Sequence, residues 1–452
     1  MVVSGAVSNG AHGVSARPSW QAFKRALAGN ALGAFPDEAF EEEVVVHRLF
    51  GRCQFILSQP DAIRHVLVDH AANYTRTSPT VRVLRPIFGD GLFLSTGEEW
   101  KHQRRTVAPA FAPRAVRILA KHVASAANLL VADLAARGER PIQLVPVLQR
   151  LALEIIGSAM FSLEMEEYGP RIRELILCYG ARLGRPSLLD FLMPAGIPSF
   201  YDLARRRFRR RWTALIEQII ADRRHRGSRN SHHDLFDLLE TGHPEDADFA
   251  GAERSPDQVT TLIVAGHETT ASALFWALYL LAITPVEQEA LAAEAETVDL
   301  DPTAAADVVP QLVRTRAFVD EVLRLYPPAF AIVRQAIEDD IAAGVAIPGR
   351  SLVLIAPWVL HRHRRIWRDP EMFEPSRFMP TAPQPSRFAY MPFGIGPRTC
   401  IGAQFALTEL VLVLSAIART FRIALAEPRV INPVGIVSTQ PEHPPPFVLR
   451  RR

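Results

Sequence analysis

Hydrophobic residues recur at helical spacing through the middle of the chain and form short strand-like runs near both ends. The strongest helical pattern begins with Ser255 as N-cap, Pro256 at the first helical position and Gln258 three residues after the cap. The apolar pattern continues to Ile283, and Pro285 then stops it. At a rise of about 1.5 Å per residue this helix is about 42 Å long, so it would cross a whole domain.

The remaining pattern predicts two further helices and a few strands. One helix covers residues 316–326 and ends at Pro327 and Pro328, and another covers residues 402–419. Strand-like runs occupy residues 43–48, 54–57, 341–347 and 352–356, and the chain from residue 429 onward has extended character. No internal repeat divides the chain. We therefore expect a mainly α fold with a small β region, in which residues 1–35 form a flexible N-terminal extension and residues 36–452 a single domain.

The composition is that of a globular protein, since 48% of the 452 residues are hydrophobic, 22% are charged and three are cysteine. These values exclude a disordered chain and a disulfide scaffold. The formal net charge of +3 is too small for wholesale binding of nucleic acid. Few cysteines, and no signal-peptide core in the first 30 residues, indicate a cytoplasmic protein, with a transit peptide over residues 1–36 as the alternative.

Polar residues interrupt the long apolar helix at its centre, where Ala265 is followed by His267, Glu268 and Thr269. Residues 259–283 would otherwise suit a membrane span, but a carboxylate in mid-bilayer is costly, so we expect no span. Inside a protein these groups still need a reason, because a buried carboxylate requires partners. For Thr269 the structural alternative is a hydrogen bond to the preceding helical turn. We interpret His267 as a core or solvated histidine.

The segment from Phe393 to Gly402 contains three glycines and ends at the predicted start of a helix, with Cys400 two residues earlier. Glycines let the backbone turn tightly and approach a flat ligand. The unpaired N–H groups and the dipole at a helix start favour a thiolate, which is the form that binds iron. The alternative is a buried structural cysteine, the role we assign to Cys53 and Cys178.

Two pairs at helical spacing add weaker signals. Glu321 and Arg324 share one helical face and could form an ion pair that is either buried or on the surface. Trp100 and Arg104 share a face in the same way, and an amphipathic surface helix would explain them equally well.

Taken together, these segments resemble the cytochrome P450 haem-thiolate monooxygenases. The cysteine loop of that family reads Phe-x-x-Gly-x-Arg-x-Cys-x-Gly, and Phe393, Gly396, Arg398, Cys400 and Gly402 match every fixed position. The resemblance covers about residues 40–450 and implies the cytochrome P450 fold with haem b as cofactor. By this resemblance, Cys400 is the axial ligand of the haem iron, Phe393 packs beside its sulfur and Arg398 meets a propionate.

The same resemblance assigns roles to the other motifs. It implies propionate contacts for Trp100, Arg104 and Arg334, and space for dioxygen beside Ala265. Thr269 would hydrogen-bond dioxygen and Glu268 would relay protons. Glu321, Arg324 and Arg377 would form a structural network, in which Ser376 replaces the glutamate that is commoner in the family. Gly402 completes the cysteine loop.

The implied reaction activates dioxygen reductively and inserts one oxygen atom into an apolar or amphipathic organic substrate. Because no reductase-like segment follows Cys400, we expect a separate ferredoxin or flavodoxin with its reductase, which would dock near Lys101, Arg105, Arg114 and Arg117. Two alternatives remain open at this stage. A peroxygenase would not need Glu268 and Thr269, and a haem-binding sensor or carrier would lack a productive relay.

Two remaining motifs have structural explanations. Residues 205–211 contain six arginines around Phe208, and we favour a solvated helix face over a lipid or substrate contact. His361 and His363 are too few for a zinc centre without further ligands. We assign them to a loop.

Overall fold

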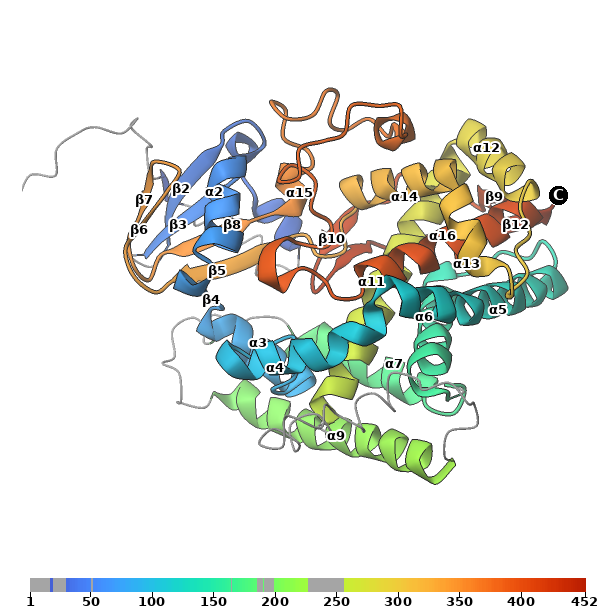
Figure 1. Ribbon diagram of the computed structural model, residues 1–452, viewed down its shortest axis with the longest axis horizontal. Coiled ribbons are helices and arrows are strands. Elements are labelled where there is room, and N and C mark those ends of the chain that lie inside the picture. The colour runs from blue at the N-terminus through green and yellow to red at the C-terminus, as the bar shows by residue number, and fades with distance from the viewer. Residues whose placement is uncertain are drawn as a thin grey trace, which may run out of the picture.

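A computed structural model describes residues 17–18, 30–49, 52–163, 165–184, 190, 199–226 and 256–452. A large helical body adjoins a smaller β region, shown at the left of Figure 1. Ser255, the predicted N-cap, lies outside the described residues. The predicted fold class, mainly α with a small β region, is confirmed.

The long central helix α11 (Pro256–Ile283) follows the apolar pattern of the sequence to its end. A helix that is apolar all round has to be buried, and α11 packs against α6 (Leu144–Phe161), α14 (Val313–Leu325) and α16 (Ala403–Thr420). The other α-helices with described bounds are α2 (Pro60–Arg64), α3 (Ser78–Phe88), α4 (Gly97–Val107), α5 (Pro113–Arg137), α7 (Gly169–Cys178), α9 (Phe200–Arg226), α12 (Pro285–Glu296), α13 (Ala305–Val308) and α15 (Pro357–Leu360).

The main sheet joins strands from the N-terminal part of the chain to strands within residues 332–355. Its strand order is β1-β2-β3-β8-β5-β4, with β1 (Arg17–Pro18), β2 (Val44–Leu49), β3 (Arg52–Leu57), β8 (Leu352–Ile355), β5 (Ile332–Ala336) and β4 (Tyr74–Thr75). β3 and β8 pair in parallel, whereas β2–β3, β8–β5 and β5–β4 are antiparallel. The final segment forms β10 (Pro433–Gly435), β11 (Thr439–Pro441) and β12 (Phe447–Arg451), and β12 pairs with β9 (Phe421–Leu425).

The stretch 341–347 is not one strand, as the sequence pattern suggested, but a hairpin. β6 (Asp340–Ala342) and β7 (Val345–Ile347) pair in antiparallel fashion. Ala343 and Gly344 between them have φ values of 48° and 85°, a left-handed conformation that reverses the chain. The alternating pattern is the same in a strand and in a tight hairpin, which explains the error.

The described body begins earlier than residue 36, where we placed the domain boundary. The Asn30 side chain donates to Pro433 O and accepts from the Gly435 N–H, and Leu32 is buried against Gly435. Residues 30–35 therefore belong to the body and not to an extension.

Two described helices are long and apolar enough to cross a membrane by length and composition, namely α5 and α16. In α16, 72% of the apolar window is buried inside the protein, and in α5 33%. The helix that raised this alternative in the sequence, α11, meets the criterion only together with α12, from which it is bent by 112°.

The arginine cluster on α9 is divided between interior and solvent. Arg205 is buried and donates two hydrogen bonds to Asp190, at 2.6 and 3.0 Å. Phe208 and Trp212 lie on the same buried face, and Arg209 pairs with Asp257. The solvated-face prediction is therefore wrong for Arg205, because its buried partner is not visible in the sequence pattern.

Candidate functional site

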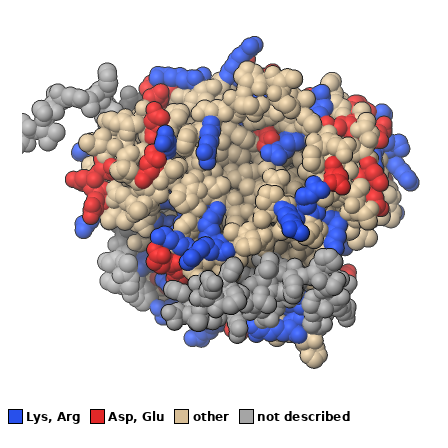
Figure 2. Space-filling view, in the orientation of Figure 1, with Lys and Arg blue, Asp and Glu red and all other residues tan. Residues whose placement is uncertain are grey.

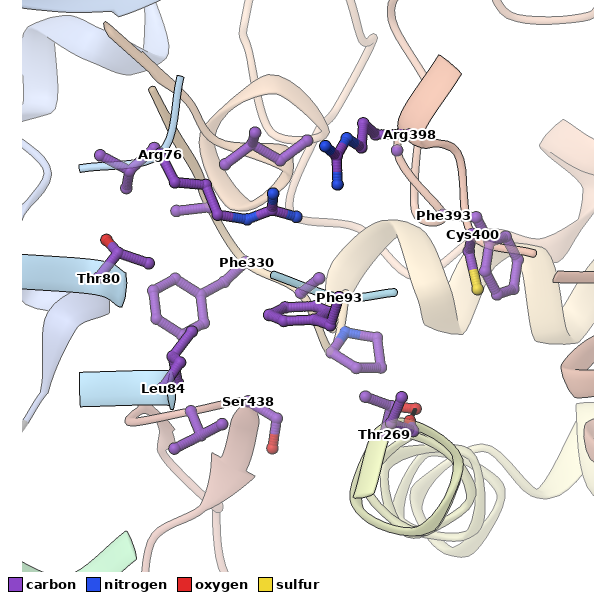
Figure 3. Close-up of a pocket in the computed structure, with 18 of the residues that line it drawn as sticks. Arg76, Thr80, Leu84, Phe93, Thr269, Phe330, Phe393, Arg398, Cys400 and Ser438 are labelled. Carbon is purple, nitrogen blue, oxygen red and sulfur yellow. Dashed lines mark hydrogen bonds between the residues drawn. The ribbon is translucent and has the colours of Figure 1, made fainter. Parts of the chain in front are cut away.

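A cavity of about 1130 Å³ lies between α11, the cysteine loop, the β region and the turn at residues 436–438. Ten residues predicted for the site line it: Trp100, Arg104, Ala265, Glu268, Thr269, Arg334, Phe393, Arg398, Cys400 and Gly402. Figure 3 shows the Phe393 ring beside the Cys400 sulfur, with Thr269 on the neighbouring helix α11. The predicted network of Glu321, Arg324 and Arg377 does not line the cavity.

The cysteine loop is closed by a hydrogen bond from the Cys400 N–H to Phe393 O, at 2.9 Å. Gly396 has a φ of 78°, and a Cβ at this position would lie 2.1 Å from the carbonyl oxygen of Leu67. Glycine is therefore required here both by backbone conformation and by space. Burial raises the pKa of the Cys400 thiol, while the Gly402 N–H and Arg104 lower it. The helix start thus lowers the thiol pKa, as the sequence predicts, but the effect of burial is larger. A metal that coordinates the sulfur deprotonates the thiol outright.

Replacing Gly396 by alanine is expected to displace the cysteine loop. A left-handed non-glycine residue costs about 1–3 kcal/mol, and the clash with Leu67 O adds to this. Gly344→Ala is the matched control, because Gly344 has a φ of 85° but nothing within 4 Å of its Cβ position. We expect the melting temperature and haem content to fall clearly further in Gly396→Ala than in Gly344→Ala. Equal losses would contradict the close approach at Gly396.

Four arginines converge on one end of the cavity. Arg76, Arg104, Arg334 and Arg398 all line it, and none forms an ion pair with a carboxylate of the described residues. Burial lowers the pKa of Arg76 to about 9 and that of Arg398 to about 10, and repulsion between the arginines acts in the same direction. Such a cluster of partly desolvated cations is suited to an anionic group.

Sequence reasoning missed Arg76. It follows β4, and continuing the register of β4 with β5, in which Thr75 faces Gln335, places it opposite Arg334. Its guanidinium also lies 5.5 Å from the centre of the Phe93 ring. No local motif marks this position, because the pairing joins segments far apart in the chain.

Trp100 lies between two of these cations. The Arg398 guanidinium is 4.2 Å and that of Arg104 5.8 Å from the Trp100 ring centre. Arg398 also donates to Ser95 O at 2.8 Å. The aromatic face therefore helps to hold both cations against the cavity.

The central turn of α11 faces the cavity through Ala265 and Thr269. The Thr269 hydroxyl donates to Ala265 O at 2.6 Å, which is the structural alternative considered from the sequence. Its oxygen retains acceptor capacity. Gly266 does not simply widen the cavity, because a Cβ there would lie 2.7 Å from Ile156 of α6, so this glycine permits close helix packing.

Glu268 is held by Ser438, in the turn at residues 436–438, and by Gln440 in the following strand β11. Its Oε1 accepts hydrogen bonds from Ser438 Oγ at 2.9 Å and Gln440 Nε2 at 2.6 Å. Burial raises the pKa of Glu268, and these two hydrogen bonds act against that rise. The carboxyl group is therefore able to hold a proton nearer to neutral pH than an exposed glutamate can.

Hydrogen bonds at Thr439, which directly follows this turn, fix its backbone to α11 and to the proline pair. Ser272 Oγ and Trp276 Nε1 both donate to Thr439 O, at 2.5 and 2.9 Å. Thr439 Oγ1 donates to Pro327 O at 2.6 Å, and its N–H donates to Pro328 O. The backbone of this turn is thus held while Ile436 and Val437 line the cavity.

A second carboxyl group, which sequence reasoning also missed, lies on α16. Glu409 is buried and lines the cavity, and its Oε1 has no hydrogen-bond partner. Burial raises the pKa of Glu409 to about 8, although a hydrogen bond with Thr270 of α11 opposes the shift. The group is therefore mostly protonated at neutral pH.

Glu409→Gln is expected to remove a pH dependence of stability. The folded protein keeps the Glu409 proton up to about pH 8, whereas the unfolded chain loses it near the ordinary value of 4.5. The native protein therefore loses stability, on the order of 4 kcal/mol, as pH rises between these values. Melting temperatures between pH 5 and 8 should change less in Glu409→Gln than in the native protein or in the exposed control Glu427→Gln. Parallel profiles for all three proteins would contradict the assignment.

Glu321 and Arg324 form a fully buried pair on α14, outside the cavity lining. Arg324 donates to both carboxylate oxygens of Glu321, at 2.6 and 2.8 Å, and to three backbone carbonyl oxygens. Arg377 is the looser member, since its Nε lies 3.6 Å from Glu321 Oε1. It pairs with Glu374 at 3.0 Å, and Ser376 donates to the same Glu374 carboxylate. The structure thus brings the three predicted residues together.

His361 supports this network and is not a metal ligand. The Met391 N–H donates to His361 Nε2 at 3.0 Å, so Nδ1 carries the proton that it donates to Arg324 O, 3.2 Å away. Burial lowers the pKa of His361 to about 3. His267 is also buried, with burial lowering its pKa to about 4, so it is a core residue and not a solvated one.

Comparison with known proteins identifies close counterparts over most of the chain. The family model described as Cytochrome P450 matches residues 29–444. Cyclooctatin synthase of Streptomyces melanosporofaciens is 34% identical over 390 residues, which cover 84% of this chain and 83% of that protein. Cyclooctat-9-en-7-ol 5-monooxygenase of the same organism is 28% identical, covering 84% and 82%. A solved structure of a cytochrome P450, CYP102L1, has a TM-score of 0.79 at 24% identity, covering 94% of this chain and 95% of that one, which supports the fold.

Proposed function

This chain belongs to the cytochrome P450 family of haem monooxygenases, and on that premise we propose that it hydroxylates an apolar, largely hydrocarbon substrate with electrons from a separate redox partner. The observation that carries the proposal is the position of Cys400. It stands in a large cavity, with arginines at one end and Thr269 on the neighbouring helix. The cavity volume of about 1130 Å³ exceeds the roughly 300–1,000 Å³ usual for a single ligand pocket, which supports a site for an organic substrate beside the cofactor.

The residues that line the cavity fit haem b, which we propose as the form of the cofactor. Cys400 offers the sulfur that haem iron takes in thiolate-ligated enzymes. Arg76, Arg334 and Arg398 offer cations without carboxylate partners among the described residues, as two propionates require. When bound, haem supplies the activation of dioxygen, and the protein contributes orientation and proton delivery.

We assign proton handling to Glu268 and Thr269. The Glu268 carboxyl has a pKa raised by burial and lies one residue from Thr269, on a stretch of α11 that lines the cavity. Its contacts with Ser438 and Gln440 hold it in place when it gives up a proton. The Thr269 oxygen can accept a hydrogen bond from a proton donor in the cavity while its own hydroxyl donates to Ala265 O.

Thr269→Ala is expected to uncouple oxygen consumption from product formation. Without the hydroxyl, protons are delivered less selectively, so reduced nicotinamide is still consumed but hydrogen peroxide replaces product. We expect product formed per nicotinamide oxidised to fall about tenfold or more. Thr269→Ser keeps the hydroxyl and should retain most of the coupling. Intact coupling in Thr269→Ala would show that the hydroxyl serves only the helix.

The lining of the cavity supports an apolar substrate. Leu84, Phe93, Phe330 and Val437 belong to it. Figure 3 shows Leu84, Phe330 and Thr80 on the side away from Cys400, with Phe93 between this group and Cys400. A pocket of this kind binds hydrocarbon surface and orients it by a few polar groups. The name cyclooctat-9-en-7-ol 5-monooxygenase describes oxidation of an unsaturated alcohol. We therefore propose that the substrate is a cyclic, mostly hydrocarbon molecule with no more than a few hydroxyl groups.

The redox partner is proposed to be an acidic ferredoxin or flavodoxin. Arg105 on α4 and Arg114 on α5 are exposed and form no ion pair with described residues, whereas Lys101 pairs with Glu98 and Arg117 with Asp307. Blue side chains surround the centre of the face seen in Figure 2. Complementary charge would speed encounter with an acidic protein. A cytoplasmic location is part of this proposal.

The decisive experiment supplies electrons and oxygen in different ways. Candidate cyclic hydrocarbons and alcohols are first screened for a change in haem spin state. The best ligand is then incubated with NADH, ferredoxin and ferredoxin reductase, or with hydrogen peroxide alone. The proposal requires hydroxylated product that depends on the electron-transfer proteins. Product with peroxide alone would indicate a peroxygenase. A protein that binds haem but turns over no candidate substrate under either condition would indicate a haem sensor or carrier.

A further inference from the structure

Two histidines and a carboxylate lie together in the β region, outside the cavity. His65 begins the π-helical turn η3 (His65–Asp69), His70 follows it, and Asp340 begins β6. The ligand atoms of these three side chains lie within 4.8 Å of one another. Among the described residues, no other group of three His, Cys, Asp or Glu side chains is arranged in this way.

The π-helical turn is what brings the two histidines together. The His70 N–H donates to His65 O at 2.8 Å, the five-residue spacing of a π-turn. In an α-helix, residues five apart point to different sides, because each residue advances about 100°. Here the two imidazole rings stack with their centres 4.0 Å apart. Single π-turns of this kind are concentrated at functional sites.

Asp340 is oriented toward the histidines by its own hydrogen bonds. Its Oδ1 accepts from the Ile341 N–H at 2.8 Å. Its Oδ2 lies 2.9 Å from His65 Nε2 and 3.6 Å from His70 Nδ1, and it also accepts from the Tyr74 hydroxyl at 3.0 Å. Burial acts to raise the pKa of Asp340, but these hydrogen bonds outweigh it and lower the pKa to about 2, so the group is a carboxylate at neutral pH.

Asn73 fixes the hairpin to the histidine turn. The Ile337 N–H donates to Asn73 O at 2.8 Å, and the Glu338 N–H donates to Asn73 Oδ1 at 3.0 Å. Asn73 Nδ2 in turn donates to Glu338 O at 3.3 Å. The two segments that carry the three side chains are therefore held in register by groups that are not themselves ligands, as outer hydrogen bonds do at metal sites.

We propose that His65, His70 and Asp340 form a zinc site with a fourth position open to water. Tetrahedral zinc with ligands at about 2.0–2.1 Å separates neighbouring ligand atoms by about 3.3 Å. The distances from Asp340 Oδ2 to His65 Nε2 and to His70 Nδ1, 2.9 and 3.6 Å, lie on either side of this value. Two imidazoles and a carboxylate are a ligand set that zinc takes readily. The His70 side chain is 54% exposed, which gives the ion a route from solvent.

Zinc at this site would stabilise the contact between η3 and the cysteine loop. Leu67 lies between the two histidines, and its carbonyl oxygen is the atom that faces Gly396. Zinc bound to both histidines would restrain η3 and hence this contact. The ion is therefore expected to stabilise the native protein and to have no part in catalysis.

The test titrates zinc chloride into the tag-free, haem-loaded full chain after removal of metals by chelation. Calorimetry should give one zinc per chain, and the melting temperature should rise with zinc and return to its starting value on chelation. His70→Ala, an exposed substitution, and Asp340→Asn, which keeps the shape of the side chain, should each weaken binding at least about 100-fold, because even outer-shell changes cost about 10–100-fold. His225→Ala removes an exposed histidine elsewhere and should bind zinc as the native protein does.

X-ray absorption of the loaded protein distinguishes the proposed site from adventitious binding. The expected zinc environment contains nitrogen and oxygen ligands with the signature of two imidazoles and no sulfur. Sulfur ligation would place the ion at a cysteine and overturn the proposal. No binding, or binding equally strong in His70→Ala and Asp340→Asn, would show that His65 and Asp340 are only a hydrogen-bonded pair.

Discussion

Cys400→Ser is expected to abolish the monooxygenase activity, lowering turnover by at least about a thousandfold, or about 4 kcal/mol on the activation barrier. Cys400 is the one cysteine that lines the cavity among the described residues, and serine cannot supply the electron donation of a thiolate. The reduced native protein under carbon monoxide should show the red-shifted Soret band of thiolate ligation. In the variant this band should be lost or replaced by that of a haem with a different ligand.

The matched control is Cys178→Ser at the end of α7. Cys178 is exposed, so the sequence-based assignment of this cysteine as a buried packing residue is wrong. This variant should leave the spectrum, the haem content and the activity unchanged. A thiolate-type spectrum that persists in Cys400→Ser would mean that another sulfur holds the iron, and the assignment of the cavity would then be wrong.

Arg324→Ala is expected to prevent accumulation of folded, haem-loaded protein. All five N–H donors of the guanidinium group are used, two on Glu321 and three on backbone carbonyl oxygens, and both side chains are fully buried. Removing one partner leaves the Glu321 carboxylate buried without its cation and costs about 3–5 kcal/mol. That is a large part of the stability of a typical domain, about 5–15 kcal/mol.

Two further variants separate this effect from a simple loss of charge. Arg324→Lys keeps the charge but offers three donors from one atom, so it should also fail to support the three carbonyl groups. Arg137→Ala removes an exposed pair with Asp133 and should cost no more than about 0.5 kcal/mol. The measurements are soluble yield, haem content and melting temperature. A folded Arg324→Ala protein with near-native melting temperature would contradict the buried-network interpretation.

The parts of the molecule that the sequence predicts are those that depend on neighbours along the chain. The apolar run and the proline after it define α11, and the glycines and the cysteine define the loop before α16. Local spacing also places Glu321 and Arg324 on one helical face. In each case the interacting groups lie within one helical turn or one loop.

The features that escaped prediction depend on contacts between distant segments. Arg76 reaches the cavity through the pairing of β4 with β5. The Glu409 carboxyl group is buried because α16, which carries it, packs against α11. Local spacing predicts a solvated Arg205, because the Asp190 carboxylate that accepts its hydrogen bonds is in another segment. The histidines at positions 65 and 70 gain a ligand-like partner from a hairpin far along the chain. No pattern of local spacing contains this information.

The turn at residues 436–438, which leads into β11, has an evolutionary consequence. Its backbone is anchored to α11 and to the proline pair, so the side chains of Ile436 and Val437 can be exchanged without altering its path. Descendants of this gene could therefore adopt new compounds by changing two residues, while the apparatus for oxygen chemistry stays intact. A combinatorial library at these two positions should therefore yield variants with altered regioselectivity that retain turnover.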